Sequence, residues 1–552
     1  MERNNTIVRF SLFVVVFLLL VGRAFGQDSL AVQRTDSVRK TKIELLHADK
    51  GRANQKERPD VQLLIGNVTL RHDSMYMYCD SAYIYQKSNS FEAFSSVRME
   101  QGDTLFINGD YLFYDGASQI AQLRRNVQLI NRNTVLSTDS LDYDRILNKG
   151  YYFNGGTLTD EDNVLTSDWG EYSTVTKQAV FNYEVQLENP QFDLFSDTLQ
   201  YNTVSKIASI VGPSEIINKK NHIYSELGFY NTSSQQAELL NRSVLTNGAK
   251  KLTGDSLFYD RERGFGEAFR NVVMNDTVNK GMLLGDYCYY DEKIDSAFVT
   301  QRAVAVDYSQ ADSMFMHADT MMIVTLDQHT DSMYRVMRAY HKVRAFSEDM
   351  QAICDSLAYV SKDSCLTMYG DPIFWNEEQQ LLGERIHIYM NDSTIDWVHI
   401  KNQTLTVERL DSIHYNQVAG KEAKGYFKNG VIHKAEVLGN VELAFYLSEQ
   451  DSTLLALNTS VASKLTMFLE HQKMQKVILS PQPKGMAYPM DQIPADKMYL
   501  KNFIWFDYLR PRSKEDIFDW QGKKEGEELK VDSRSENDPT KGRDLRSLVK
   551  MK

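Results

Sequence analysis

The sequence predicts an elongated all-β protein made of stacked repeats, each about 29 residues long, that form two facing antiparallel sheets. The first observation is a recurring motif in which a small residue precedes an acid and a Tyr follows four positions after the acid, as at Asp110 and Tyr114. The second is that apolar and polar residues alternate inside each unit, which is the period of a half-buried strand. Such units cannot bury their apolar faces alone, so we expect them to stack.

The acids of the motif recur mostly at intervals of 29 residues. They are Asp110, Asp139, Asp168, Asp197, Glu226, Asp255, Asp286 and Asp355, with looser copies at Asp80, Asp319 and Glu384. Each acid has the same strand parity as the inward Leu and Tyr, and a buried column of like charges is prohibitively unfavourable. We therefore expect each acid at the start of a strand, on a solvated rim. A calcium-binding column is the alternative, although the glycine-rich nonapeptide of calcium-binding β-rolls is absent.

Two short apolar patterns alternate within each unit. One places Leu and Tyr two and four residues after the acid, and the other ends with an apolar pair seventeen and nineteen residues after it. Polar, glycine-containing stretches such as residues 115–118 separate the patterns, so each unit is predicted to be strand, turn, strand, turn. Stacking places like side chains in columns that line an apolar interior. The candidate lining residues are Leu112, Tyr114, Val127, Leu129, Leu141, Tyr143, Val185, Leu187, Leu199, Tyr201, Leu257 and Tyr259.

The N-terminal residues have the features of an export signal. Arg3 and Arg9 give a positive start, residues 10–21 are almost wholly apolar, and Ala24 and Gly26 are the small residues that a signal peptidase requires. We predict a cleaved signal peptide at residues 1–26. An uncleaved anchor is the alternative, but the apolar run is shorter than the roughly 20 residues that span a bilayer. Residues 27–59 are then a lead-in segment, and residues 60–480 form the repeat array.

The composition changes after the array. Half of the ten prolines lie between Pro481 and Pro511, interleaved with Tyr, Phe and Trp residues. Because proline cannot donate to a strand ladder, residues 481–520 are predicted to cap the open end of the array, with a partner-binding motif as the alternative. Residues 521–552 are charged and almost free of aromatics, which predicts a disordered tail.

Several classes of chemistry find little support in this sequence. The formal net charge of −12 argues against a general nucleic-acid binder. No G-x-S-x-G, H-E-x-x-H or phosphate-loop motif occurs, so no catalytic residue, metal site or cofactor is predicted. A glycosidase on a β-stack is an alternative, but equivalent acids in every unit indicate a structural role. Cys354 and Cys365 are either a disulfide pair or buried free thiols.

The repeat resembles a known family. Residues Asp139-Ser140-Leu141-Asp142-Tyr143-Asp144 and the matching run at 255–260, together with Asn126-Val127-Gln128-Leu129, are similar to the OstA-like/LptA family over roughly residues 40–480. This resemblance implies an elongated open β-jelly roll in the periplasm of a Gram-negative cell. It further implies a bridge that carries lipopolysaccharide to the outer membrane.

The resemblance also implies ligands and partners. Acyl chains of lipid A would lie in an apolar groove between the sheets, with the phosphorylated sugars in water. Other jelly-roll transport proteins would add to an exposed edge strand, which we expect at the N-terminal end near Val61 to Leu70. An exported structural or adhesive protein without lipid cargo, in which the array is only a spacer, is the alternative.

Overall fold

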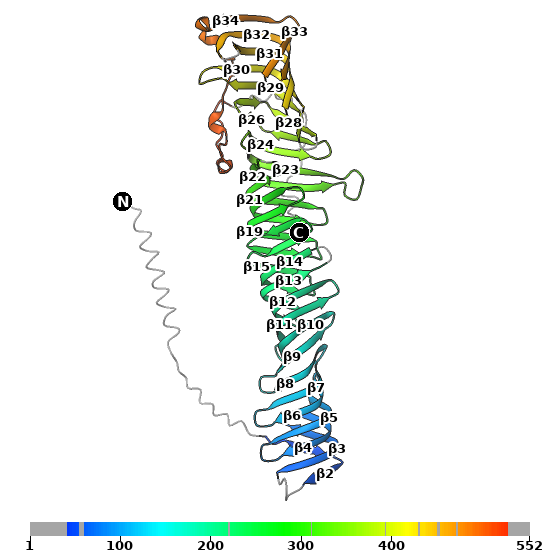
Figure 1. Cartoon of the computed structure of the whole chain (residues 1–552). Coiled ribbons are helices and arrows are strands. Elements are labelled where there is room, and N and C mark those ends of the chain that lie inside the picture. Colours follow the sequence, from blue (N-terminus) through cyan, green and yellow to red (C-terminus); the bar gives the residue numbers. More distant parts are fainter. Residues whose placement is uncertain are drawn as a thin grey trace, which may run out of the picture.

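The computed structural model describes residues 41–53, 60–218, 221–310, 312–391, 394–428, 431–449, 453–470 and 473–527. The predicted signal peptide and residues 528–552 of the predicted tail lie outside the described residues. The strands stack along a long, narrow body from β2 near one end to β34 at the other (Figure 1). All of them belong to one 34-stranded sheet with antiparallel pairing, and the only helices of the described residues are four short 3-10 turns. The predicted elongated all-β jelly roll is confirmed.

The strands of the first part are β1 (Glu44–His47), β2 (Lys50–Ala53), β3 (Val61–His72), β4 (Met75–Tyr85), β5 (Ser90–Gln101), β6 (Leu105–Asp115), β7 (Ile120–Asn131), β8 (Thr134–Asp144), β9 (Lys149–Asp160), β10 (Asn163–Ser173), β11 (Gln178–Asn189), β12 (Phe192–Asn202), β13 (Ile207–Ile217), β14 (Asn221–Asn231), β15 (Gln236–Leu240) and β16 (Val244–Asn247).

The remaining strands are β17 (Lys250–Thr253), β18 (Ser256–Asp260), β19 (Phe265–Asp276), β20 (Gly281–Asp291), β21 (Ser296–Asp307), β22 (Met314–Leu326), β23 (Tyr334–Phe346), β24 (Met350–Val360), β25 (Cys365–Tyr369), β26 (Ile373–Asn376), β27 (Gln379–Leu382), β28 (Arg385–Asn391), β29 (Thr394–Arg409), β30 (Tyr415–Lys428), β31 (Val431–Ser448), β32 (Leu454–Glu470), β33 (Lys473–Ser480) and β34 (Lys484–Pro489). The 3-10 turns are η1 (Met490–Gln492), η2 (Ala495–Lys497), η3 (Asp507–Leu509) and η4 (Asp516–Phe518).

Each long strand contributes to both facing layers. The β6–β7 register shifts between Asn108 and Tyr111, and an equivalent shift recurs near the middle of most strands. A β-bulge bends the strand that contains it, so the sheet folds along a line of bulges into two arms. We call the halves that carry the Leu/Tyr pattern the tyrosine arm, and the halves that carry the Val/Leu pattern the valine arm. The two predicted layers are therefore two halves of one sheet.

The recurring acids stabilise these bulges. Arg125 and Asn126 have φ of 64° and 51°, and Asn126 Nδ2 donates to Asp110 Oδ2 at 2.7 Å. The same arrangement recurs between Asn271 and Asp255 and between Asn402 and Glu384. Asn tolerates the left-handed conformation better than most residues. The prediction that the acids begin strands is wrong: they lie at the corner between the arms, in mid-strand or at a strand break, where water reaches them.

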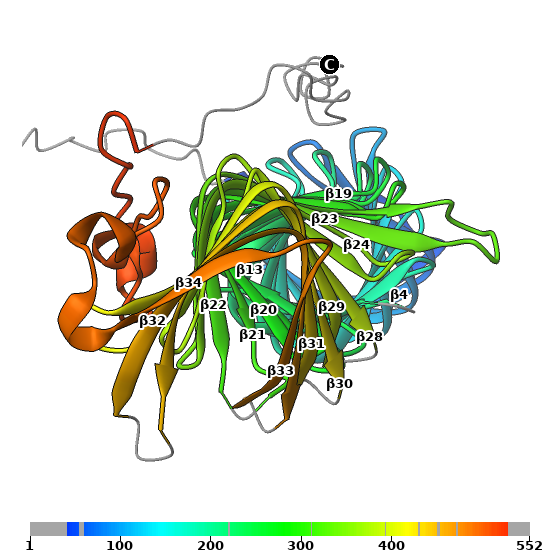
Figure 2. The same ribbon diagram turned by 90° about the horizontal axis from the view of Figure 1, so that it is seen from above.

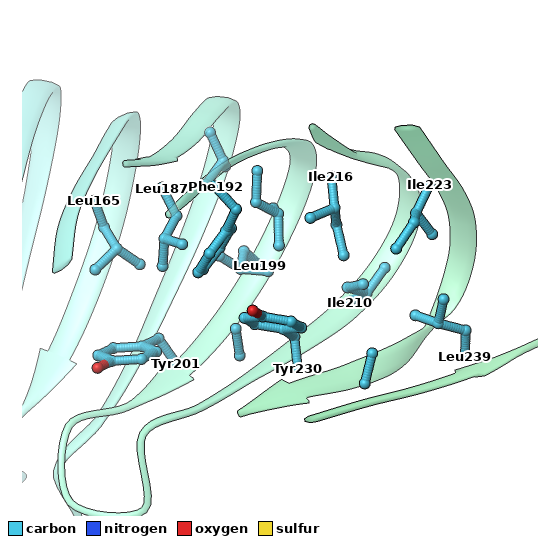
Figure 3. Packing of buried hydrophobic residues seen from close by; sticks show 14 of the residues in the cluster. Leu165, Leu187, Phe192, Leu199, Tyr201, Ile210, Ile216, Ile223, Tyr230 and Leu239 are labelled. Atoms are coloured by element: carbon cyan, nitrogen blue, oxygen red, sulfur yellow. The ribbon is translucent and has the colours of Figure 1, made fainter. Parts of the chain in front are cut away.

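Apolar columns run through the core, but adjacent members are not all alike as predicted, because each unit contributes two strands to a column. In the tyrosine arm a large ring on one strand faces a small residue on the next. This row comprises Tyr114, Ala121, Tyr143, Gly150, Tyr172, Ala179, Tyr201, Ala208, Tyr230, Ala237, Tyr259, Gly266 and Tyr290. Figure 3 shows Tyr201 and Tyr230 in this row, and the ring centroid of Tyr230 lies 4.5 Å from that of Phe192 of the opposite arm. Alternation of large and small residues fills the space evenly.

The array begins earlier than predicted. Strands β1 and β2 lie within the predicted lead-in segment and pair with the two halves of β3. The expectation of a free edge near Val61 to Leu70 is therefore wrong, because β1 and β2 already occupy the outer edge of β3. At the other end, β33 and β34 both pair with β32, and Pro489 ends β34.

The Pro/aromatic segment does not cover the end of the array as predicted. After β34 the chain runs back along the outer face of the valine arm, outside the strands near β32 and β34 (Figure 2). Its apolar residues pack successively on Tyr446, Trp375 and Val304, which belong to β31, β26 and β21. We call residues 490–527 the strap.

Candidate functional site

The predicted lining residues lie in the interior of the jelly roll. All of them belong to the main hydrophobic core or pack against it, and all except Tyr259 are buried, with exposed fractions of 4% or less. Their side chains fill the space between the two arms. In this part of the array the interior is therefore a packed core.

A second row of apolar residues runs along the inner face of the valine arm, one residue per strand. We call it the inner aliphatic row: Met77, Met99, Ile107, Leu129, Leu136, Leu158, Leu165, Leu187, Leu194, Ile216, Ile223, Leu245, Leu252, Met274, Leu283, Ala305, Met316, Ala345, Ala352, Phe374 and Leu381. Up to Ile223, every member is exposed by 4% or less. From Leu245 onward, the members are half-buried with the exception of Ala345.

The row of tyrosines changes at the same place. Tyr201 is fully buried and Tyr230 is 4% exposed, whereas Tyr259 and Tyr290 are half-buried. The strands also change there. Two short strands, β15 and β16, replace one long bulged strand, and β17 and β18 replace the next. We call the array before Leu245 the closed section and the array from Leu245 onward the open section.

A polar seam joins the tips of the two arms in the closed section. Its centre is a buried ion pair, with Lys206 Nζ of the tyrosine arm 2.8 Å from Asp160 Oδ2 of the valine arm. The Tyr201 hydroxyl donates to the same oxygen at 2.8 Å, and Asn163 Nδ2 donates to that hydroxyl at 3.1 Å. Asp160 itself is 1% exposed. A buried charge of this kind is stable only when it is paired and hydrogen-bonded, as here.

Related contacts extend the seam in both directions. Arg145 Nη2 donates to the His72 carbonyl at 3.2 Å, and Lys177 Nζ donates to Asn131 Oδ1. At the far end, Arg261 Nη1 donates to the Gln191 carbonyl at 3.1 Å. These contacts join turns that are sequentially distant but adjacent in space.

Beyond Arg261, the hydrogen bonds at the tips of the described strands join neighbours within one arm. The Thr325 hydroxyl donates to Asp295 in the tyrosine arm, and the Tyr308 hydroxyl donates to Asn275 in the valine arm. The seam thus ends close to the point where the inner aliphatic row becomes half-exposed. We infer that the two changes have one structural origin, the separation of the arm tips.

The seam also contains a buried histidine. Arg145 Nη1 and the Tyr114 hydroxyl lie 3.1 Å and 2.6 Å from His72 Nδ1, and the Thr41 carbonyl lies 3.1 Å from its Nε2. Burial, reinforced by the Arg145 charge, lowers the pKa of His72. The neutral ring can accept from Arg145 at Nδ1 and donate to Thr41 from Nε2, so this contact favours the neutral form.

The interior offers little reactive chemistry. The four cysteines are free and buried, so Cys354 and Cys365 are not paired, and burial raises the pKa of Cys79 and Cys288 to about 12. Within the described residues, no group of three His, Cys, Asp or Glu side chains is placed to hold a metal ion. No helix in the described part of the chain is long and apolar enough to cross a membrane.

The half-exposed members of the inner aliphatic row were not among the predicted lining residues. Leu252, Leu283 and Met316 each lie three residues before a recurring acid, as Ile107 and Leu136 do in the closed section. This position carries an apolar residue in most repeats and is the signal that would have identified the row. Its degree of exposure has no comparable signal, because it depends on contacts between turns that are distant in the sequence.

Comparison with known proteins finds a family that resembles the first part of the array. A family model described as OstA-like protein matches residues 40–197 and 193–255. No curated protein matches the chain. The matched residues cover the closed section and end just inside the open one. With the stacked repeats described above, this match shows that residues 40–255 are similar to the OstA-like family, whose proteins are of the lipopolysaccharide-transport type.

Proposed function

We propose that the protein is a periplasmic lipopolysaccharide-binding transport protein, part of a bridge that moves lipopolysaccharide to the outer membrane. The acyl chains would lie against the inner aliphatic row in the open section. The observation that carries this proposal is the change in that row from fully buried to half-exposed at Leu245. The OstA-like match supports the transport class.

The chemistry of the open section suits an acyl chain. Leu252, Met274, Leu283 and Met316 lie on successive paired strands with Ala305 between the last two, so they form a continuous apolar strip. Transfer of each acyl methylene from water onto such a surface is favourable by about 0.8 kcal/mol. Met side chains adapt to ligands of different shape because they are unbranched and flexible. The sugar and phosphate groups would remain in water beyond the separated arm tips.

The closed section has a different role in this proposal. Its interior is already filled by side chains such as Leu141 and Tyr143, which leaves no space for an acyl chain. It would act as a rigid extension that sets the position of the open section and presents β1 and β2 to the next protein of the bridge. Unpaired strand edges are suited to strand addition by a partner.

Site-specific photocrosslinking tests the proposal. A photoreactive phenylalanine analogue at Leu283 should crosslink to lipopolysaccharide in a Gram-negative cell, and the same analogue at Met316 should do so as well. The matched control is Leu187, which occupies the same row in the closed section and is fully buried. Crosslinks at neither open-section position, in protein that is exported and folded, would reject lipid binding there. That result would favour the structural or adhesive alternative, which the packed closed section also fits.

A further inference from the structure

The valine arm of the open section is apolar on both faces. Phe374 and Leu381 point inward and pack against the main core. The adjacent residues Trp375 and Leu382 point outward and are fully buried in a separate cluster. A sheet must bury an apolar face against another layer, and on this side that layer is the strap.

Three buried glutamines contact the strap, and two of them bind its backbone. Gln351, Gln380 and Gln417 lie in one cross-strand row on the outer face, separated by Trp375 and Val407. Each is exposed by 4% or less. Glutamine is mostly found on protein surfaces, so three buried ones in a single row require an explanation.

Two of the glutamines make the paired hydrogen bonds that a neighbouring strand would make. Gln417 Nε2 donates to the Met498 carbonyl and its Oε1 accepts from the Leu500 amide, both at 2.8 Å. Gln380 Nε2 donates to the Ile504 carbonyl at 2.9 Å, and its Oε1 accepts from the Phe506 amide at 2.8 Å. Side-chain amides thus satisfy backbone groups that the irregular strap would otherwise bury unpaired.

Side chains of the strap fill the surface between these points. Phe506 and Leu509 are buried among Ile353, Trp375 and Leu405. Arg510 Nε donates to Gln351 Oε1 at 2.6 Å, and Lys523 forms an ion pair with Asp371. The combination of backbone recognition with a few buried aromatic and aliphatic anchors is how proteins bind extended peptides.

We propose that the outer face of the valine arm over β24–β30 is a peptide-binding site and that the strap is its exchangeable ligand. The site recognises an extended segment with apolar anchors at the positions of Leu500, Phe506 and Leu509. Because the strap supplies the outer layer of this arm, the inner face can stand apart from the opposite arm. This inference does not require that a lipid binds inside.

A nicked full-length protein tests the exchange. A protease site inserted between Ala495 and Asp496, both exposed, allows the strap to be cut from the array after folding. The cut strap should remain bound, and a fluorescent synthetic peptide of residues 496–524 should replace it on incubation. Failure of the peptide to bind the cut protein would overturn the proposal.

Substitution of the glutamines tests the recognition. Q380L and Q417L each remove a pair of hydrogen bonds while nearly keeping the side-chain volume, and each should weaken peptide binding at least tenfold. Gln186→Leu is the matched control, because Gln186 points outward from the same arm in the closed section, away from the strap. Peptide affinity equal to that of the unsubstituted protein in both variants would show that the glutamines do not recognise the strap. Circular dichroism confirms that each variant keeps its strand content.

A distance measurement tests the layer role. Spin labels at Glu348 and Lys362, at opposite ends of β24, report the separation of the arms in the open section. Displacement of the cut strap by dilution should shorten this distance, because the uncovered arm will bury its inner face against the opposite arm. Labels at Asn133 and Ile146, beside the ends of β8, should not move. An unchanged open-section distance after loss of the strap would contradict the layer role, whatever the result of the lipid crosslinking.

Discussion

Replacement of Lys206 by Met should open the closed section locally. The substitution keeps the aliphatic stem but leaves the Asp160 carboxylate, whose side chain is 2% exposed, without its cation. Loss of one partner from a buried ion pair costs about 3–5 kcal/mol. We expect a cost near the lower end, about 3 kcal/mol, because the Lys206 side chain retains 16% exposure and Tyr201 still donates to Asp160. Since 1.4 kcal/mol is a factor of ten, local opening should increase by roughly a hundredfold.

Hydrogen exchange of backbone amides measures this effect directly. Amides of β9 to β13 should exchange faster in Lys206→Met, while those of β3 to β5 should not change, because distant repeats unfold independently. Lys149→Met is the matched control: its ion pair with Glu171 lies on the outer surface, with side-chain exposures of 35% and 22%, and is worth at most about 1 kcal/mol. If both variants exchange alike, the seam does not hold the arms together and the reasoning fails.

Two further predictions concern the bulges and the pH response. Asn126→Ala removes the donor to Asp110 and places an alanine at φ 51°, a left-handed conformation that alanine disfavours. It should destabilise the neighbouring repeats by about 1–2 kcal/mol in exchange experiments. Asn126→Gly should cost less, because glycine adopts this conformation without strain. Burial, with Lys401 nearby, lowers the pKa of His387 to about 4, so the folded protein keeps this ring neutral. Protonation of His387 then favours the unfolded chain, so the protection of β25 and β28 amides from hydrogen exchange should fall as the pH drops from 6.5 towards 4. A His387→Gln variant that shows the same fall would contradict this assignment.

The stacking of repeats was predictable because it rests on period alone. Leu141 and Tyr143 recur at fixed positions after the acid, and each joins a cross-strand row once the units stack, where Leu141 pairs with Leu123 and Tyr143 with Ala121. The family resemblance rested on the same residues and agrees with the OstA-like match. The identity of the residues in each column was therefore available from the sequence, even though the path of the backbone was not.

The bend in each strand was not predictable from hydrophobic alternation. Two consecutive left-handed residues, such as Arg125 and Asn126, shift the parity within a strand and turn one predicted strand into parts of two layers. The acid at the corner was misplaced for this reason. The division into closed and open sections was not predictable either. Lys206 and Asp160 lie in different repeats, and only their proximity in space creates the seam.

The strap shows why one repeat can form both a packed core and a half-exposed surface. In the closed section, Leu187 is buried because the opposite arm covers it and the seam holds that arm in place. In the open section, the opposite arm does not cover the corresponding Leu283 in the same way. The arm must therefore bury its other face, the outer one, against another layer. Outward residues such as Trp375, held under Phe506 of the strap, meet this requirement. The apolar outer face and the exposed inner face thus belong to a single structural solution, which is why loss of the strap should close the arms instead of unfolding the array.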